Sequence, residues 1–126
     1  MGRKALRPGA APAPPWRYRD ADEGYGATAT PDWRDTDWSR ELKRVEIGGT
    51  PVNYVDVGSG EREPVVLVHG LGGQWQNWLE NIPRLAQDRR VLALDLPGHG
   101  LTPEPEDDDI SISGYGRCVD AFCEQL

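Results

Sequence analysis

The stretch Pro64-Val-Val-Leu-Val-His-Gly-Leu-Gly-Gly73 is the most informative part of this 126-residue chain. Its first half is a continuous apolar run, typical of a strand that is buried on both faces of a parallel sheet. Its second half is a glycine-rich turn. A second run of the same kind, Arg90-Val-Leu-Ala-Leu-Asp95, leads into a second turn, Leu96-Pro-Gly-His-Gly100. Two buried strands that each end in a glycine turn indicate an α/β fold.

Shorter β-rich runs precede this pair of strands. Residues 44–47 and 52–57 are separated by Gly48-Gly-Thr-Pro51, which predicts a hairpin. Between the two buried runs, residues 75–88 are divided by Pro83. We therefore expect a short turn of helix there, followed by a second piece with Pro83 near its start.

The last helical pattern lies at the end of the chain. Tyr115, Cys118, Val119, Phe122 and Leu126 recur at helical spacing, after a candidate N-cap at Ser111 or Ser113. An alternation of buried strands and helices is typical of right-handed βαβ units. The sequence therefore predicts a mostly parallel sheet of about four strands with two helical segments.

The large aliphatic residues divide the chain into two parts. Residues 1–44 contain only two Val, Ile or Leu residues, whereas residues 45–126 contain 22. A segment with so few cannot bury enough apolar surface to offset its conformational entropy. We expect residues 1–31 to be a disordered, Ala/Pro-rich segment and residues 32–126 to form a partial domain. Trp33 and Trp38 either pack as an arm on this domain, which the pattern favours, or dock on a partner.

Charge and cysteine content exclude several classes of protein. The net charge of −7 argues against a nucleic-acid or membrane-surface binder, because both require a basic face. The acidic run Glu104–Asp109 lacks the alternating ligands and glycine of a calcium loop, so it predicts a solvated loop. Cys118 and Cys123 form neither a zinc cluster nor a disulfide framework. The pattern shows neither a secretory leader nor a membrane span, so we expect a cytoplasmic protein. We also expect no metal site.

The two glycine turns are where chemistry is expected, since ligands of open α/β sheets bind at the carboxyl ends of the strands. Glycines at 70, 72 and 73 can aim backbone N–H groups at a developing oxyanion. A dinucleotide site is the alternative, with Gly70-Leu-Gly72 at the phosphates and Asp95 at a ribose. That alternative is disfavoured because the third glycine of its motif falls on Trp75.

Together, VVLVHGLGG and RVLALDLPGHGLTPEP resemble the N-terminal part of an α/β-hydrolase-fold protein, over about residues 45–126. The resemblance implies that residues 65–69 and 91–95 are the third and fourth strands of that sheet. It also implies that the backbone N–H of Leu71 is an oxyanion donor and that Gly72 is a possible second donor. Thr102 stands where the family usually has serine. No metal or organic cofactor is implied.

Other residues of the two turns have structural interpretations beside functional ones. His69, Gly70 and Gly73 are expected to shape the oxyanion loop, His69 as a hydrogen-bonding residue at the strand end rather than as the catalytic base. His99 and Asp95 are expected to stabilise the second turn, with Asp95 accepting turn N–H groups. Trp75 and Trp78 are candidates for a substrate-pocket wall, although packing under the loop is the favoured interpretation.

The catalytic nucleophile, acid and base of this family are not found in the chain. The fold requires a nucleophile in a G-x-S-x-G elbow, and none of the four serines has glycine at both −2 and +2. The resemblance implies that the elbow follows the strand after the last helix, beyond Leu126. We therefore expect an N-terminal fragment that is inactive alone. It would leave residues 65–69 as an open, apolar, aggregation-prone edge.

The expected function is that of the intact parent. A serine esterase-like hydrolase acting on a small carboxylic ester is the first hypothesis. An epoxide hydrolase, a haloalkane dehalogenase or a carbon–carbon bond hydrolase of the same fold are alternatives. Proline often follows His-Gly closely in the epoxide and haloalkane branches, whereas Leu71-Gly-Gly73 follows it here. A non-catalytic, truncated or partner-binding protein is the rival from another class.

Overall fold

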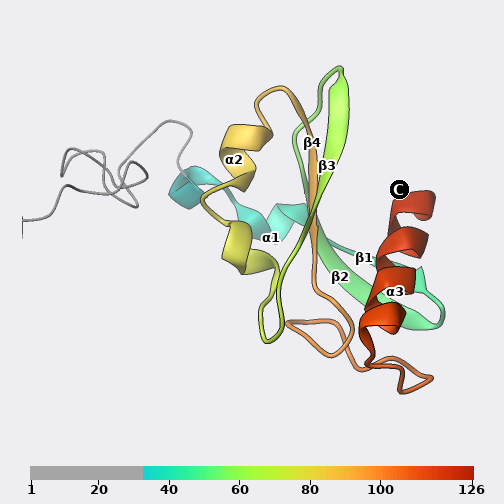
Figure 1. The fold of residues 1–126 in the computed structure, drawn as a ribbon. Coiled ribbons are helices and arrows are strands. Elements are labelled where there is room, and N and C mark those ends of the chain that lie inside the picture. The colour runs from blue at the N-terminus through green and yellow to red at the C-terminus, as the bar shows by residue number, and fades with distance from the viewer. Residues whose placement is uncertain (1–32) are drawn as a thin grey trace, which may run out of the picture.

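The computed structural model describes residues 33–126, which form one sheet with helical segments on both faces (Figure 1). The sheet order is β1-β2-β4-β3. The strands are β1 (Leu42–Ile47), β2 (Thr50–Val57), β3 (Arg62–Val68) and β4 (Arg89–Leu94). The helices are the 3-10 segments η2 (Trp33–Asp35) and η3 (Trp75–Trp78) and the α-helices α1 (Trp38–Glu41), α2 (Ile82–Leu85) and α3 (Ile112–Gln125). The disorder expected for residues 1–31 falls outside the described residues.

The four expected strands are present, but the expectation of a mostly parallel sheet is wrong for this part of the chain. β1 pairs with β2 and β2 pairs with β4 in antiparallel fashion, and only β3 and β4 run parallel. The physical reason is the tight Gly48-Gly49 turn, which makes β1 and β2 a hairpin, whereas a parallel pair needs a crossover connection. Residues 33–126 contain three α-helices rather than the two helical segments expected, and α1 is the additional one.

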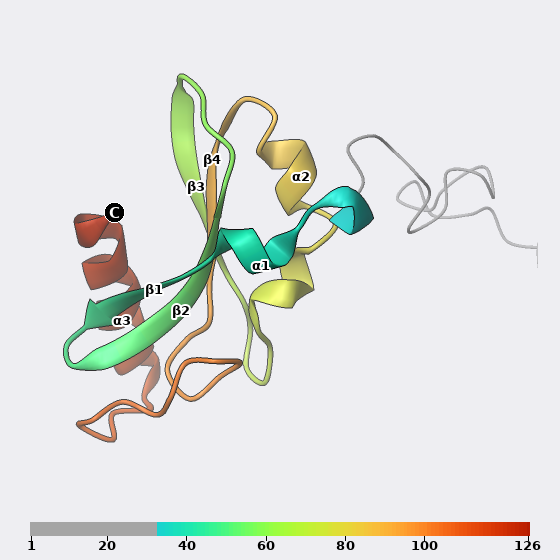
Figure 2. The ribbon, with the colours of Figure 1, turned by 180° about the vertical axis from the view of Figure 1, so that it is seen from behind.

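Side-chain alternation along β2 and β4 creates a core on each face of the sheet. Tyr54 and Leu94 point to one face, where they pack with Phe122 and Cys118 of α3. Val55 and Ala93 point to the other face, where they pack with η3 and α2. The views from both sides show α3 on one face and α1, η3 and α2 on the opposite one (Figure 2). The expected helix with its N-cap is confirmed, because the Ser111 side chain accepts from the Gly114 N–H.

Strand β3 lies at the edge of the sheet. The expectation that this strand is buried on both faces is wrong for the described residues. Val65, Val66 and Leu67 are half-buried, and Val68 is 37% exposed. Among residues 33–126, β4 is the only strand that pairs with β3. The open apolar edge expected from the sequence is therefore present. Unpaired edges of this kind are templates for pairing with further chain.

The tryptophans near residue 35 pack on the domain as an arm. The ring centroid of Trp38 lies 5.2 Å from that of Trp75, and the Trp38 indole N–H donates to the Trp33 carbonyl at 2.9 Å. Trp38 also packs against the core formed by Val55 and Ile82. These contacts match the packing interpretation for Trp38, and docking on a partner stays a hypothesis. No helix among residues 33–126 has the length and hydropathy needed to span a bilayer.

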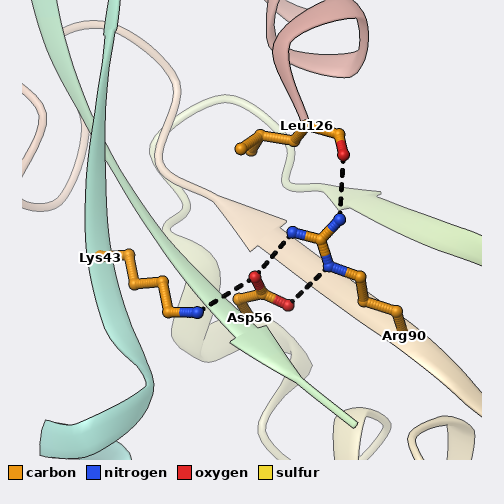
Figure 3. A network of polar contacts seen from close by, with 4 residues as sticks. All are labelled: Lys43, Asp56, Arg90 and Leu126. Carbon is orange, nitrogen blue, oxygen red and sulfur yellow. Dashed lines mark hydrogen bonds and ion pairs between the residues drawn. The ribbon is translucent and has the colours of Figure 1, made fainter. Parts of the chain in front are cut away.

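A network of polar contacts around Asp56 joins three strands and the end of α3 (Figure 3). Both oxygens of Asp56 on β2 accept from the Arg90 guanidinium on β4, at 2.9 and 2.8 Å. The Lys43 ammonium on β1 donates to the same carboxylate at 3.2 Å. Arg90 also donates to the Leu126 carbonyl at 2.9 Å. The hydrogen bonds from Arg90, then those from Lys43, hold the pKa of Asp56 below its ordinary value.

Replacing this carboxylate gives a prediction with a defined pH dependence. In the full-length protein, Asp56→Asn should lower the free energy of unfolding at pH 7 by about 1–3 kcal/mol, because hydrogen bonds to charged groups contribute at this level. The folded-state pKa lies below the unfolded value of about 3.9, so the contribution is complete above that pH. It is lost as the pH falls through the folded-state pKa.

Denaturant titrations of both proteins at neutral and acidic pH measure this difference. Asp88→Asn is the matched control, because the Asp88 carboxylate pairs with Arg62 and Arg89 while remaining half exposed. It should change the free energy of unfolding little, since exposed ion pairs contribute little. A gap between Asp56→Asn and the parent that stays the same at acidic pH would contradict the assignment.

Candidate active site

The two glycine turns lie next to each other at one end of the sheet (Figure 1). β3 and β4 are parallel neighbours, and Val68 stands opposite Leu94. The turns that follow these strands therefore begin at the same end of the sheet. Residues 69–73 form the first turn, and residues 95–102 form the second. The sequence-predicted residues of both turns are therefore brought together.

The Asp95 carboxylate is the centre of the second turn and is completely buried. It accepts from the Trp75 N–H at 2.7 Å, the Asn53 side-chain amide at 2.9 Å and the Leu101 N–H at 3.0 Å. Three donors compensate a charge that would otherwise be very unfavourable away from water. These bonds join β2, η3 and the second turn. The expectation that Asp95 accepts turn N–H groups is confirmed, and it now includes a donor from η3.

Contacts with Asp95 also explain which residues occupy positions 100 and 102 of the second turn. Gly100 has a φ of +52°, and a Cβ at this position would overlap the Asp95 carboxylate. The buried Thr102 hydroxyl donates to the Asp95 carbonyl at 2.8 Å and accepts from the Asn53 N–H at 2.9 Å. A serine could make the same hydrogen bonds, so threonine keeps the hydroxyl chemistry of this position.

The first turn leaves one candidate donor without a partner. The Gly73 N–H donates to the Gly70 carbonyl at 3.0 Å, and the Gly72 N–H donates to His99 Nε2 at 3.2 Å. Among residues 33–126 no partner is found for the Leu71 N–H, and the Leu71 side chain is 94% exposed. The backbone of this turn is thus tied on both sides of a free N–H group. In this structure Gly72 is engaged and does not offer a second free donor.

The two histidines of the turns make structural hydrogen bonds through both ring nitrogens. His69 is buried, and its Nε2 accepts from the Leu96 N–H at 3.0 Å. His99 accepts from Gly72 and lies with Nδ1 3.1 Å from the Pro97 carbonyl. The structure therefore shows the hydrogen-bonding roles expected for both. Their cross-contacts between the two turns were not foreseen, because residue types alone do not show which turn each ring reaches.

Trp75 and Trp78 lie in the core under the first turn. Trp75 is 4% exposed and belongs to the cluster of Val55 and Ile82, with Trp78 packed against the same cluster. Their indole N–H groups are buried and have no hydrogen-bond partner among the described residues. These contacts match the packing interpretation. A role in walling a substrate pocket stays a prediction.

The acidic run lies mostly exposed, and Cys118 and Cys123 are free thiols. Glu104, Glu106 and Asp107 are exposed, as expected for a solvated loop. Asp109 lies just before α3, and its carboxylate accepts hydrogen bonds from the hydroxyl and the N–H of Ser111. These hydrogen bonds hold the pKa of the Asp109 carboxyl below its ordinary value. Burial raises the pKa of the Cys118 thiol. Residues 33–126 contain no group of three or more side chains that could hold a metal ion.

Comparison with known families identifies the class of protein. Residues 63–126, just over half of the chain, match the α/β hydrolase fold family. The chain belongs to this family. This assignment replaces the dinucleotide-binding alternative for the first glycine turn.

Individual relatives cover several activities. Over 58 residues the chain is 52% identical to the dihydrolipoyllysine-residue acetyltransferase component of the acetoin cleaving system of Pseudomonas putida. This match covers 46% of this chain and 16% of that protein. Over 74 residues it is 43% identical to the 2-hydroxy-6-oxo-2,4-heptadienoate hydrolase of a Pseudomonas putida strain, covering 56% of this chain and 26% of that protein. The chain thus spans between a sixth and about a quarter of the length of these relatives.

A solved structure supports the fold directly. The Cif epoxide hydrolase from Acinetobacter nosocomialis superimposes with a TM-score of 0.61 and 30% sequence identity. The match covers 68% of this chain and 26% of that one. The fold of this chain is therefore similar to a part of that longer epoxide hydrolase.

The crowding around Asp95 predicts opposite effects for the same substitution at two glycines. In the full-length protein, Gly100→Ala should lower the free energy of unfolding by about 2–4 kcal/mol, because the new Cβ clashes with Asp95 and the left-handed φ is strained. Gly116→Ala, in α3 with nothing within 4 Å of the new Cβ, should raise it by about 1 kcal/mol. Thermal or denaturant unfolding measures both, and equal effects would contradict this account of the second turn.

Proposed function

We propose that this chain supplies the oxyanion side of a hydrolase that cleaves a carbon–carbon bond next to the ketone of a small molecule. In this proposal a nucleophile beyond Leu126 attacks the carbonyl carbon. The Leu71 N–H donates to the oxygen, which becomes negatively charged as the tetrahedral species forms. His69, Gly70 and Gly73 shape the turn that holds this donor.

The observation that carries the proposal is the unpaired Leu71 N–H at the carboxyl end of β3. Its neighbours Gly72 and Gly73 both donate within the site, so the turn around it is fixed. A preorganised donor aimed at a developing charge costs little reorganisation when the reaction occurs. An N–H that has no partner among residues 33–126, and is followed by two N–H groups that are paired, has the properties of such a donor.

The substrate class rests on the relatives and changes the order of the sequence-based hypotheses. A named substrate of one relative is an oxo dienoate, which carries a ketone rather than an ester. Hydrolysis at a ketone has no oxygen or nitrogen leaving group, so it must break a carbon–carbon bond. The relatives therefore favour the carbon–carbon bond alternative over the carboxylic ester that was the first hypothesis.

An epoxide hydrolase is the second candidate, favoured by the structural match to the Cif enzyme. The sequence of the first turn weighs against it, since Leu71-Gly-Gly73 lacks the proline frequent in that branch. The two candidates differ in the elbow: a G-x-S-x-G elbow supports attack by serine on a carbonyl, and a G-x-D-x-G elbow supports attack by aspartate on an epoxide.

The described serines do not supply this nucleophile. Ser39 lies in α1, Ser59 lies in the link between β2 and β3, and Ser111 and Ser113 lie at the start of α3. None of these serines lies in the turns directly after β3 and β4, at residues 69–73 and 95–102. The proposal therefore requires an elbow encoded after Leu126, and a reading frame that closes directly after this residue would overturn it.

Removing the Leu71 N–H tests the proposal. In the full-length protein, Leu71→Pro should lower kcat about 10²–10³-fold, the loss typical of one oxyanion donor. The substitution breaks no existing hydrogen bond, because this N–H has no partner among residues 33–126. Steady-state kinetics with an oxo dienoate substrate measure the effect, with p-nitrophenyl acetate and styrene oxide as the ester and epoxide comparisons.

Leu71→Ala is the matched control, since it keeps the N–H and shortens a side chain that is 94% exposed. It should retain the larger part of kcat. Equal losses in Leu71→Pro and Leu71→Ala would show that the side chain matters rather than the backbone donor. Turnover of styrene oxide without turnover of the ketone would favour the epoxide hydrolase.

A further inference from the structure

Two histidines connect the glycine turns in a reciprocal manner. His69 leaves β3 at the first turn, and its Nε2 accepts from the Leu96 N–H of the second turn at 3.0 Å. His99 lies in the second turn, and its Nε2 accepts from the Gly72 N–H of the first turn at 3.2 Å. The two ring centroids are 4.9 Å apart. Each turn therefore contributes one imidazole that holds the backbone of the other.

The partners of these rings define their protonation state. A backbone N–H can only donate, so Nε2 of each histidine must carry a lone pair. The other nitrogen faces a carbonyl, which can only accept: His69 Nδ1 lies 2.7 Å from the Gly70 oxygen and His99 Nδ1 lies 3.1 Å from the Pro97 oxygen. Both rings must then be neutral, with the proton on Nδ1.

We propose that His69 and His99 form a clasp between the two turns, and that His99 is a positioning residue that keeps Gly72 occupied and the Leu71 N–H fixed and free. This inference rests on the proposed function, because it assigns His99 a part in preparing the oxyanion donor. His99 acts through Gly72 and does not itself touch the reacting carbonyl.

The importance of His99 follows from how little else restrains this part of the turn. Gly72 has a φ of +72°, and nothing lies within 4 Å of the place where its Cβ would be. The neighbouring Leu71 side chain is exposed and packs on no core. Among the described residues the hydrogen bond to His99 is the only one that the Gly72 N–H makes. Without that acceptor, Gly72 would be free to rotate and to compete with Leu71 for an oxyanion.

Two rings face His99: that of His69 from the end of β3, at 4.9 Å between ring centroids, and that of Tyr115 of α3, at 5.9 Å. The Asp95 carboxylate is already occupied by its three donors.

Amide NMR and kinetics of the full-length protein test this proposal with two matched variants. His99→Phe keeps an aromatic ring and removes the acceptor, whereas His99→Gln offers an amide oxygen near the position of Nε2. His99→Phe should lower the hydrogen-exchange protection of the Gly72 amide about fivefold or more, the factor expected for one lost hydrogen bond. His99→Gln should restore part of it.

The kinetic arm separates positioning from a purely structural role. His99→Phe should lower kcat while leaving KM nearly unchanged, with partial rescue in His99→Gln. Unchanged Gly72 protection in His99→Phe would overturn the clasp. Lost protection with unchanged kcat would overturn the positioning role. Absence of hydrolase activity in the parent would defeat the proposed function alone, because the Gly72 amide still reports on the clasp.

Discussion

The burial of the Asp95 carboxylate is the constraint on which both glycine turns depend. A fully buried charge is tolerated only when donors surround it, and here they come from Asn53, Trp75 and Leu101. These three residues belong to β2, η3 and the second turn. One carboxylate therefore fixes where the helical segment after the first turn begins and how the second turn closes.

The polar contacts of the two turns differ in kind. The second turn is a rigid support, in which Gly100 leaves room for the carboxylate and Thr102 bridges Asp95 to β2. The first turn lies on this support and is tied to it through His69 and His99. An oxyanion donor must keep its place as charge develops, and a backbone N–H on such a support meets that requirement.

Much of this arrangement could be predicted from the sequence, because its signals are local. Apolar runs predicted β3 and β4, the glycine pair predicted the β1–β2 hairpin, and Ser111 was a correctly placed N-cap candidate. What failed depends on pairing between distant segments. The strand order and the mostly antiparallel sheet follow from which strands meet, and no local pattern encodes this. The reciprocal histidine contacts were missed for the same reason.

The central claim is that the Leu71 N–H, and not that of Gly72, receives the negative oxygen in this half of the site. The most direct measurement is the amide spectrum of the full-length protein before and after it binds a trifluoromethyl ketone, which forms a tetrahedral adduct with a seryl nucleophile. The Leu71 amide proton should shift downfield, while the Gly72 amide remains where its hydrogen bond to His99 places it. A shift of the Gly72 amide with no change at Leu71 would contradict the assignment of Leu71 as the donor.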